Sequence, residues 1–205
     1  LPQKVFDDAS RQWKERFSDI KKMNGSENPY SLHRELAEQM ITNVLIVRQN
    51  SKLEATLDKI NEFESRWKNI KCLDTTDWSN PVPSFINQLW NMIHLSKVIT
   101  KGALMRDEFR GSHYKPEFDL KQPDDFQPDT YVEFEKQKAN GGLNESAFDK
   151  QHLAYMKRYA ENNKKWLKTT IAEYKNGNSG LEGGPEISFE DVDTSLISPI
   201  PRKYN

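Results

Sequence analysis

Residues 84–110 read SFINQLWNMIHLSKVITKGALMRDEFR, and this stretch decides the fold. Its apolar residues recur at three- and four-residue spacing on more than one face, which predicts one long helix buried on several sides. The stretch follows a polar turn that ends in Pro81 and Pro83, and proline is favoured just inside the start of a helix. We therefore expect this helix to be the central element of the chain.

Three amphipathic helices are predicted before it. The first has apolar residues at helical spacing over residues 5–20 and stops at Asn24-Gly25. The second opens at Asn28-Pro29, an N-cap residue followed by proline at the first helical position. For the third, the sequence Ser51-Lys52-Leu53-Glu54 matches a capping box. Long helices joined by short loops form an antiparallel bundle.

The pattern changes after Gly111. Residues 116–128 contain three prolines and read as an extended connector. Two polar helices are predicted at about 129–139 and 145–164. A small β-hairpin follows at about 166–192, with strand-forming residues on both sides of a glycine-rich loop, and then an extended tail.

We thus predict a mainly α fold with two parts. Residues 1–110 form an antiparallel helical bundle of three to four long helices. Residues 111–205 form a C-terminal extension with two extra helices (about 129–164), the small β-hairpin and the tail.

Composition excludes several classes of function. Net charge is −1 over 205 residues, with acidic residues as frequent as basic ones, so we expect no nucleic-acid partner. The single cysteine, Cys72, excludes an internal disulfide. No apolar run approaches the roughly 18 residues needed to cross a bilayer. One cysteine and four dispersed histidines give no metal-ligand spacing, so no metal site is predicted.

Individual reactive residues point to structural roles. His94 lies in the apolar central helix, where a histidine hydrogen-bonded in or beside the core is expected. His152 lies on a charged helix and is expected to be exposed. Cys72 would be nucleophilic only if folding brought a histidine close to it. We therefore predict no catalytic residue in this chain.

One cationic cluster stands out in Arg106, Arg110, His113 and Lys115, directly after the central helix. One hypothesis is C-terminal capping of that helix, because Arg and Lys favour the negative end of the dipole and Gly111 could take the left-handed cap. The other is a docking surface for carboxylates across a domain or subunit interface, which two guanidinium groups suit well. Both hypotheses remain open from the sequence.

At this cluster the chain resembles the C-terminal region of the succinate dehydrogenase and fumarate reductase flavoprotein subunit. That family carries the pattern Arg-x-Glu-Ser-Arg-Gly-x-His, which here reads Arg106-Asp-Glu-Phe-Arg-Gly-Ser-His113, with Phe109 in place of serine. The resemblance covers nearly the whole chain except residues 122–164, where the two extra helices look like an insertion. It is closer to the bacterial succinate:quinone oxidoreductase type than to the mitochondrial one. The other matching stretches are Asn28–Leu36, Asn43–Glu54, Gln88–Leu95, Trp166–Ile171, Asp191–Ile197 and Pro199–Tyr204.

The resemblance implies a function for a larger protein. The full-length subunit would interconvert succinate and fumarate by hydride transfer to FAD and pass electrons to an iron–sulfur subunit. This segment would pack against the flavin-binding domain of the same polypeptide and against the iron–sulfur subunit, and would meet a membrane anchor only indirectly. The family's flavin and dicarboxylate residues lie upstream of this region, so we expect the chain to bind no cofactor and to be inactive alone. The complex would be cytoplasmic, peripheral on the inner face of the cell membrane.

Two alternatives belong to different classes. L-aspartate oxidase shares the Arg-Gly-x-His neighbourhood, so the chain could be its C-terminal domain. A stand-alone helical interaction protein without a redox role would have the same helices. A glycine-rich dinucleotide motif upstream of Leu1 in the reading frame would favour a flavoprotein, whereas a start codon there would favour the interaction protein.

Overall fold

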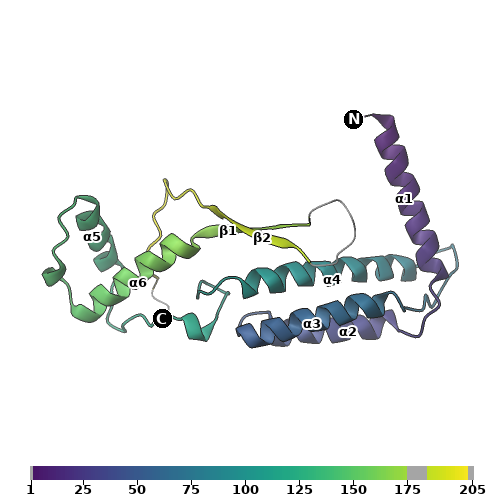
Figure 1. Cartoon of the computed structure of the whole chain (residues 1–205), viewed down its shortest axis with the longest axis horizontal. Coiled ribbons are helices and arrows are strands. Elements are labelled where there is room, and N and C mark those ends of the chain that lie inside the picture. The colour runs from purple at the N-terminus through teal and green to yellow at the C-terminus, as the bar shows by residue number, and fades with distance from the viewer. Residues whose placement is uncertain (1, 175–183, 203–205) are drawn as a thin grey trace. The chain divides into compact units, whose positions relative to one another are not determined.

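The fold is mainly α-helical, as the sequence predicts (Figure 1). The computed structural model describes residues 2–174 and 184–202, which form six α-helices, two short 3-10 helices and a two-stranded sheet. In chain order the elements are α1 (Gln3–Lys22), α2 (Pro29–Asn43), α3 (Asn50–Trp67), α4 (Val82–Leu104), η1 (Pro116–Phe118), α5 (Pro128–Ala139), η2 (Glu145–Ala147), α6 (Lys150–Trp166), β1 (Lys168–Glu173) and β2 (Glu186–Asp191).

Packing divides the chain into two compact units. The first unit comprises Leu1–Met105 and Glu173–Glu186, and the second comprises Arg106–Ala172 and Ile187–Asn205. Each unit has a hydrophobic core of its own.

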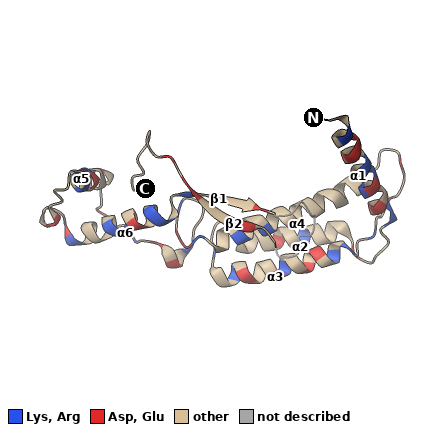
Figure 2. Ribbon diagram, turned by 45° about the horizontal axis from the view of Figure 1, so that its top comes forward, with Lys and Arg blue, Asp and Glu red and all other residues tan. Residues whose placement is uncertain are grey.

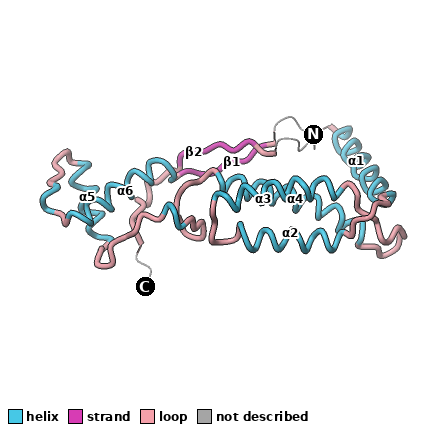
Figure 3. The backbone as a smooth tube through the Cα atoms, turned by 60° about the horizontal axis from the view of Figure 1, so that its bottom comes forward, coloured by secondary structure: helices cyan, strands magenta, loops and turns pink. Residues whose placement is uncertain are grey.

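The first unit is built on the predicted helical bundle. Helices α2, α3 and α4 lie side by side in Figures 1 and 3, and α4 also packs against α1. Ile86, Leu89 and Ile93 of α4 are completely buried, and α4 contributes more buried residues than any other described helix. The prediction that this helix is the central element is therefore confirmed.

The start of α2 matches its sequence signal. The Asn28 side chain accepts hydrogen bonds from the backbone N–H of Tyr30 (2.9 Å) and Ser31 (3.4 Å), and Pro29 occupies the first helical position. These bonds satisfy donors that a helix leaves unpaired at its N-terminus.

The predicted start of α3 was wrong. Helix α3 begins at Asn50, with Gln49 as an N-cap that makes no side-chain capping bond, so Ser51 already lies in the first turn. In the turn before α3, the Arg48 guanidinium donates to the backbone oxygens of Val44 (2.6 Å) and Leu45 (3.3 Å), which directly follow α2. Helix α4 also differs, since it runs from Val82 to Leu104 and ends well before the predicted Arg110.

The two connections at one end of the bundle pair with each other. Isolated β-bridges join Asn24 to Lys71 and Glu27 to Ile70. Gly25 donates its N–H to the Ile70 oxygen at 3.1 Å, and a Cβ at Gly25 would lie 1.9 Å from the Asn69 oxygen. Only glycine allows so close an approach of the two backbones.

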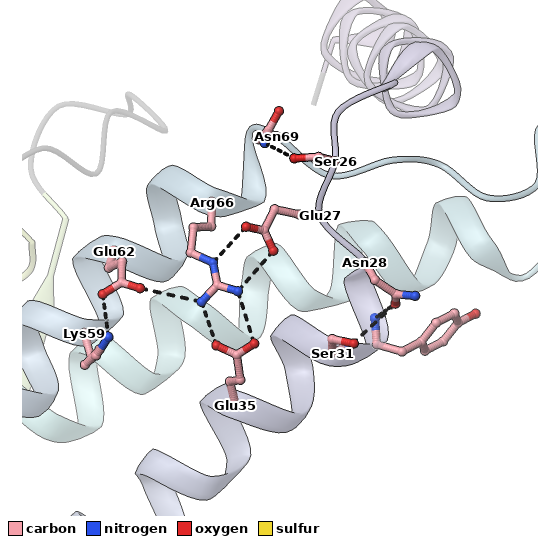
Figure 4. A network of polar contacts seen from close by, with 10 residues as sticks. Ser26, Glu27, Asn28, Ser31, Glu35, Lys59, Glu62, Arg66 and Asn69 are labelled. Carbon is pink, nitrogen blue, oxygen red and sulfur yellow. Dashed lines mark hydrogen bonds and ion pairs between the residues drawn. The ribbon is translucent and has the colours of Figure 1, made fainter.

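A polar clamp closes the same end of the bundle (Figure 4). Arg66 of α3 donates two hydrogen bonds to Glu27 (3.1 and 3.0 Å) and two to Glu35 of α2 (2.6 and 3.1 Å). The two carboxylates raise the pKa of Arg66, and the hydrogen bond from Arg66 lowers the pKa of Glu35. This planar fork between two carboxylates fixes the segment before α2 against the end of α3.

The second unit contains the two extra helices and most of the hairpin. Helix α5 lies close to the predicted 129–139, and α6 starts at Lys150 after the short helix η2 instead of at 145. Asp149 caps α6 by accepting from the N–H groups of Gln151 (2.8 Å) and His152 (3.2 Å). The two helices pack on a core that contains Phe126, Tyr131, Phe134, Tyr155 and Met156.

The predicted hairpin is present as the pair β1 and β2. The glycine-rich loop predicted between the strands falls mostly on residues 175–183, outside the described residues, as do residues 203–205 of the predicted tail. Among the described helices, none combines the length and the apolar character that crossing a bilayer requires.

Candidate interaction site in residues 106–115

The cationic cluster does not cap α4. Helix α4 ends at Leu104, and the backbone N–H of its C-cap residue Met105 donates to the oxygen of Lys101. Gly111 is left-handed, with φ of 58°, but it lies in a tight turn in which Arg110 and His113 exchange two backbone hydrogen bonds of 3.0 Å. The capping hypothesis is therefore wrong, because the helix ends before the cluster and Gly111 serves another turn.

Both arginines pair with one buried carboxylate. Glu108 is 1% exposed and accepts from Arg106 Nε and from Arg110 Nε, each at 2.8 Å. A second nitrogen of Arg106 also donates to the same Glu108 oxygen that Nε contacts. Two guanidinium groups therefore offset the cost of burying one carboxylate.

Arg106 joins the cluster to the end of α6 and the start of β1. Its guanidinium donates to the backbone oxygens of Trp166 and Lys168 (2.8 Å for Lys168) and to the Thr170 hydroxyl (2.8 Å). The same group lies 5.8 Å from the ring centroids of Trp166 and Phe189. It is thus held by hydrogen bonds in its plane and by aromatic faces beside it.

The other members of the cluster are also held within the second unit. Arg110 donates to Asn163 Oδ1 of α6 at 3.0 Å. His113 Nε2 donates to the Arg106 backbone oxygen at 2.8 Å. Lys115 is completely buried, and its ammonium group donates to Asp107 at 3.0 Å and lies 5.6 Å from the Phe118 ring centroid.

Phe109 occupies the position at which the family pattern has serine. Its ring lies 4.7 Å from that of Tyr114, on the other side of the tight turn. The bonds of Arg106, Glu108 and Arg110 are all made without a hydroxyl at position 109. The turn is therefore supported by an aromatic pair in this chain.

The structure joins Arg106, Arg110 and His113 in one network around Glu108, and Lys115 pairs with Asp107 in the same segment. Sequence reasoning missed its centre, Glu108, although this residue lies between the two arginines along the chain. The network offers charge-assisted hydrogen bonds and a fixed backbone, and it contains no nucleophile next to a base. Within the part of the chain that the structure describes, no group of three His, Cys, Asp or Glu residues is placed to hold a metal ion.

His94 is partly buried, and its ring makes no hydrogen bond within the part of the chain that the structure describes. Both ring nitrogens lack a partner among the described residues, and the ring lies edge-on to Trp90 (4.3 Å) and Tyr174 (6.3 Å). Burial lowers the pKa of His94 to about 4. The expectation of a hydrogen-bonded core histidine was wrong, because the His94 ring packs against the rings of Trp90 and Tyr174.

His152 and Cys72 have local partners. Only 16% of the His152 side chain is exposed, since it packs on Phe126 and bonds Asp125 at 2.9 Å, so the expectation of an exposed histidine was wrong. Cys72 is buried in the bundle core, where its thiol donates to the Asp74 backbone oxygen at 3.1 Å.

A hollow of about 500 Å³ lies in the first unit beside the C-terminal half of α1. Its walls mix acidic, basic and apolar groups, with the Arg16 guanidinium 5.8 Å from the ring centroid of Trp67. It is lined by Gln12, Glu15, Arg16, Asp19, Ile20, Met23, Trp67 and Lys68. No polar side chain among these is deeply buried, so the hollow does not have the lining of a specific ligand site.

Known flavoproteins resemble this chain over most of its length. Residues 33–204 match the family described as fumarate reductase flavoprotein C-terminus. The succinate dehydrogenase flavoprotein subunit of Bacillus subtilis is 37% identical over 201 residues, which cover 98% of this chain and 27% of that protein. The 8-methylmenaquinol:fumarate reductase flavoprotein subunit of Wolinella succinogenes is 30% identical over 112 residues, which cover 54% of this chain and 18% of that protein.

A solved structure shows the same fold. A quinol fumarate reductase of E. coli superposes with a TM-score of 0.68 at 18% sequence identity, covering 97% of this chain and 27% of that one. The chain thus spans about a quarter of the length of the relatives that it matches from end to end. Because the family match extends over most of the chain, this chain belongs to the C-terminal domain family of fumarate reductase and succinate dehydrogenase flavoproteins.

Proposed function

We propose that this chain is the C-terminal helical part of a flavoprotein subunit that interconverts succinate and fumarate. The observation that carries the proposal is the 37% identity to a succinate dehydrogenase flavoprotein subunit over 98% of the chain. FAD bound elsewhere in the full-length subunit would supply the hydride-accepting chemistry, and an iron–sulfur subunit would be the electron acceptor.

The flavin is held outside this chain. A dinucleotide site needs a strand, a glycine turn and then a helix, so that the pyrophosphate meets the helix N-terminus. In the described residues the two strands pair with each other, and neither is followed directly by a helix. The residues present do not fit FAD, and we derive no catalytic step from them.

The role of this chain within the subunit is structural and not catalytic. It packs against the flavin-binding domain of the same polypeptide and against the iron–sulfur subunit. Exposed apolar side chains support this role, because several large ones gather at Ile41, Leu45, Ile46 and Val47 around the turn between α2 and α3. Clusters of that kind mark surfaces that other protein covers.

Three further points belong to the proposal. The helical bundle and the C-terminal extension are distinct domains of this part of the subunit, with the inserted helices in the extension and the boundary after Met105. The assembled complex is cytoplasmic and lies on the inner face of the cell membrane, where a membrane anchor is reached only through partner subunits. Arg106, Arg110, His113 and Lys115 stiffen a surface at a domain or subunit interface.

The test uses the full-length reading frame. The purified subunit should contain flavin and reduce an artificial dye with succinate, and L-aspartate should give no reduction. The chain of residues 1–205 alone should give no dye reduction with either substrate. Turnover by the isolated chain, or oxidation of L-aspartate in place of succinate by the full-length protein, would refute the proposal.

A further inference from the structure

Helix α1 carries an apolar stripe that is only partly covered. The stripe consists of Val5, Phe6, Ala9, Trp13, Phe17 and Ile20 at three- and four-residue spacing. At its C-terminal end Ile20 is 2% exposed and belongs to the bundle core, and Phe17 is half-buried. Further toward the N-terminus Trp13 is 51% exposed and Phe6 is 56% exposed. One continuous stripe is therefore buried at one end and exposed at the other.

The covered end fixes the direction of the helix. The Arg16 guanidinium lies 5.8 and 5.9 Å from the ring centroids of Trp67 and Trp90 and donates to Asn87 Oδ1 of α4. Figures 1 and 3 show α1 leaving the end of the bundle formed by α2, α3 and α4. Among the aromatic rings of the described residues, Trp13 contacts only Phe17 of the same stripe, with 6.3 Å between the ring centroids.

Phe6 and Trp13 expose large aromatic side chains on the same face of α1, as residues at an interface do. Each aromatic side chain buries on the order of 150–250 Å² in a core or interface, which makes such residues the usual anchors of an interface. The stripe is continuous with a packed core, so a partner that covers it would extend that core and not form a separate one.

The relatives indicate which partner covers the exposed end of the α1 stripe. The matched family is the C-terminal part of the flavoprotein, and the matched segment makes up 27% of the Bacillus subtilis subunit. In such a subunit most of the polypeptide precedes α1, and the exposed end of the stripe is the end nearest to that preceding part. We propose that the exposed end of the α1 stripe is a docking surface for the flavin-binding part of the same polypeptide, which receives Phe6 and Trp13 in an apolar groove. This inference rests on the proposed function.

The polar face of α1 argues against a lipid surface as the occupant. Asp7 and Asp8 alternate there with Lys4, Arg11 and Lys14, and Figure 2 shows both signs of charge along the helix. Helices that lie on anionic membranes carry mainly Lys and Arg on that face. Mixed charge is typical of a helix face that stays in water beside a protein interface.

The test measures access to each face of α1 in the full-length subunit. Ala9→Cys places a thiol on the stripe between Phe6 and Trp13, and Arg11→Cys places the matched control on the polar face; both positions are exposed in this chain. Maleimide labelling, read at each site by peptide mass spectrometry, should be at least about tenfold slower at position 9 than at position 11. Equal rates at the two positions would overturn the proposal.

The remaining outcomes identify other occupants and also overturn it. Slow labelling of Ala9→Cys that needs added iron–sulfur subunit assigns the stripe to that partner. A rate that falls with protein concentration assigns it to a second copy, and a rate that falls only with phosphatidylglycerol–phosphatidylcholine vesicles assigns it to a membrane. Flavin content and succinate-dependent dye reduction, measured on the same samples, test the proposed function separately from the docking surface on α1. A flavin-loaded subunit that oxidises succinate but labels equally at both positions rejects the docking surface alone.

Discussion

Glu108 is the shared hydrogen-bond acceptor of Arg106 and Arg110. Its carboxylate is buried, and it is balanced by Arg106 and Arg110 at hydrogen-bonding distance. A buried ion pair adds little by itself, but removal of one partner leaves uncompensated charge in a poorly solvated place. The two arginines would then face each other without an anion between them.

Replacing Glu108 by glutamine should therefore destabilise the chain. We expect a loss of roughly 3 kcal/mol in the free energy of unfolding, measured from urea denaturation. Glu117→Gln is the matched control, because Glu117 is exposed in the same segment, and its change should stay within about 0.5 kcal/mol. Equal effects of the two substitutions would show that solvent already screens the Glu108 network.

His94 gives the first unit a defined response to acid. Burial depresses its pKa to about 4 from the ordinary 6.5, so the unfolded chain binds more protons than the folded chain between these two values. The contribution of neutral His94 to stability is fully present above pH 6.5 and is lost as the pH falls toward 4.

Replacing His94 by phenylalanine should flatten this response. Denaturation midpoints of the wild type should fall between pH 6.5 and 4 more steeply than those of His94→Phe, because the variant has no ring to protonate. Parallel curves for the two proteins would contradict a His94 ring that is neutral and shielded from water.

The cationic cluster shows how far sequence reasoning reaches for a single site. The four residues were identified because they are close in sequence, and the structure holds all of them within the second unit. Their acceptors were missed because Asn163, Trp166, Lys168 and Thr170 are more than fifty residues away, and only the tertiary fold brings them to Arg106 and Arg110. Whether a partner also uses this surface remains a prediction.

At the scale of helices and strands, periodicity predicted which elements exist and failed at their ends. The spacing of apolar residues gave all four helices of the bundle, and Asn28 gave the start of α2. Helix α3 begins at Asn50 without a side-chain cap, and α4 stops at Leu104, directly before residues that make tertiary contacts such as the bond of Arg106 to the Lys168 backbone oxygen. Helical spacing in a sequence carries no record of such contacts.

Gly25 should be indispensable to the paired connections of the bundle. In Gly25→Ala the new methyl group would lie 1.9 Å from the Asn69 oxygen, so the two connections would have to separate. We expect a loss of about 2–3 kcal/mol in urea denaturation, comparable to overpacking in a core. Gly142→Ala is the control, because nothing lies within 4 Å of the position that its new methyl group would take. A harmless Gly25→Ala would show that the two connections separate easily.

The Arg66 clamp between α2 and α3 should depend on salt and pH. Arg66→Gln removes four hydrogen bonds to Glu27 and Glu35, and we expect a loss of about 1–2 kcal/mol, reduced by the partial exposure of these groups. Because the bond to Arg66 lowers the pKa of Glu35, this contribution is present above the ordinary glutamate pKa of 4.5 and is lost below it.

The comparison variant for the clamp is Lys59→Gln, which removes an exposed pair with Glu62 at the edge of the same network, since Glu62 also lies 3.6 Å from Arg66. Its effect on the urea midpoint should stay within about 0.5 kcal/mol. If 1 M salt abolished the difference between Arg66→Gln and Lys59→Gln, the clamp would be a screened surface interaction.

At the scale of the whole molecule, the chain has more core than its composition suggests. The two extra helices have weak apolar faces, and residues 116–128 read as a connector without a hydrophobic role. Phe126 of that connector is nevertheless completely buried, and it packs edge-on against Tyr155 at 4.9 Å in the second core. An isolated aromatic residue in a proline-rich segment has no periodicity, so sequence patterning could not assign it to a core.

Two separate cores predict two separate responses to mutation. Phe126→Ala should remove about 4 kcal/mol from the second unit, because a buried aromatic side chain is lost and a cavity remains. Hydrogen–deuterium exchange should then rise in peptides of α5 and α6 and stay unchanged in α2, α3 and α4. Leu89→Ala, at a completely buried position of the first core, should produce the opposite pattern. If either substitution raised exchange equally in both sets of helices, the chain would unfold as one cooperative body. The inserted helices would then depend on the bundle for their stability.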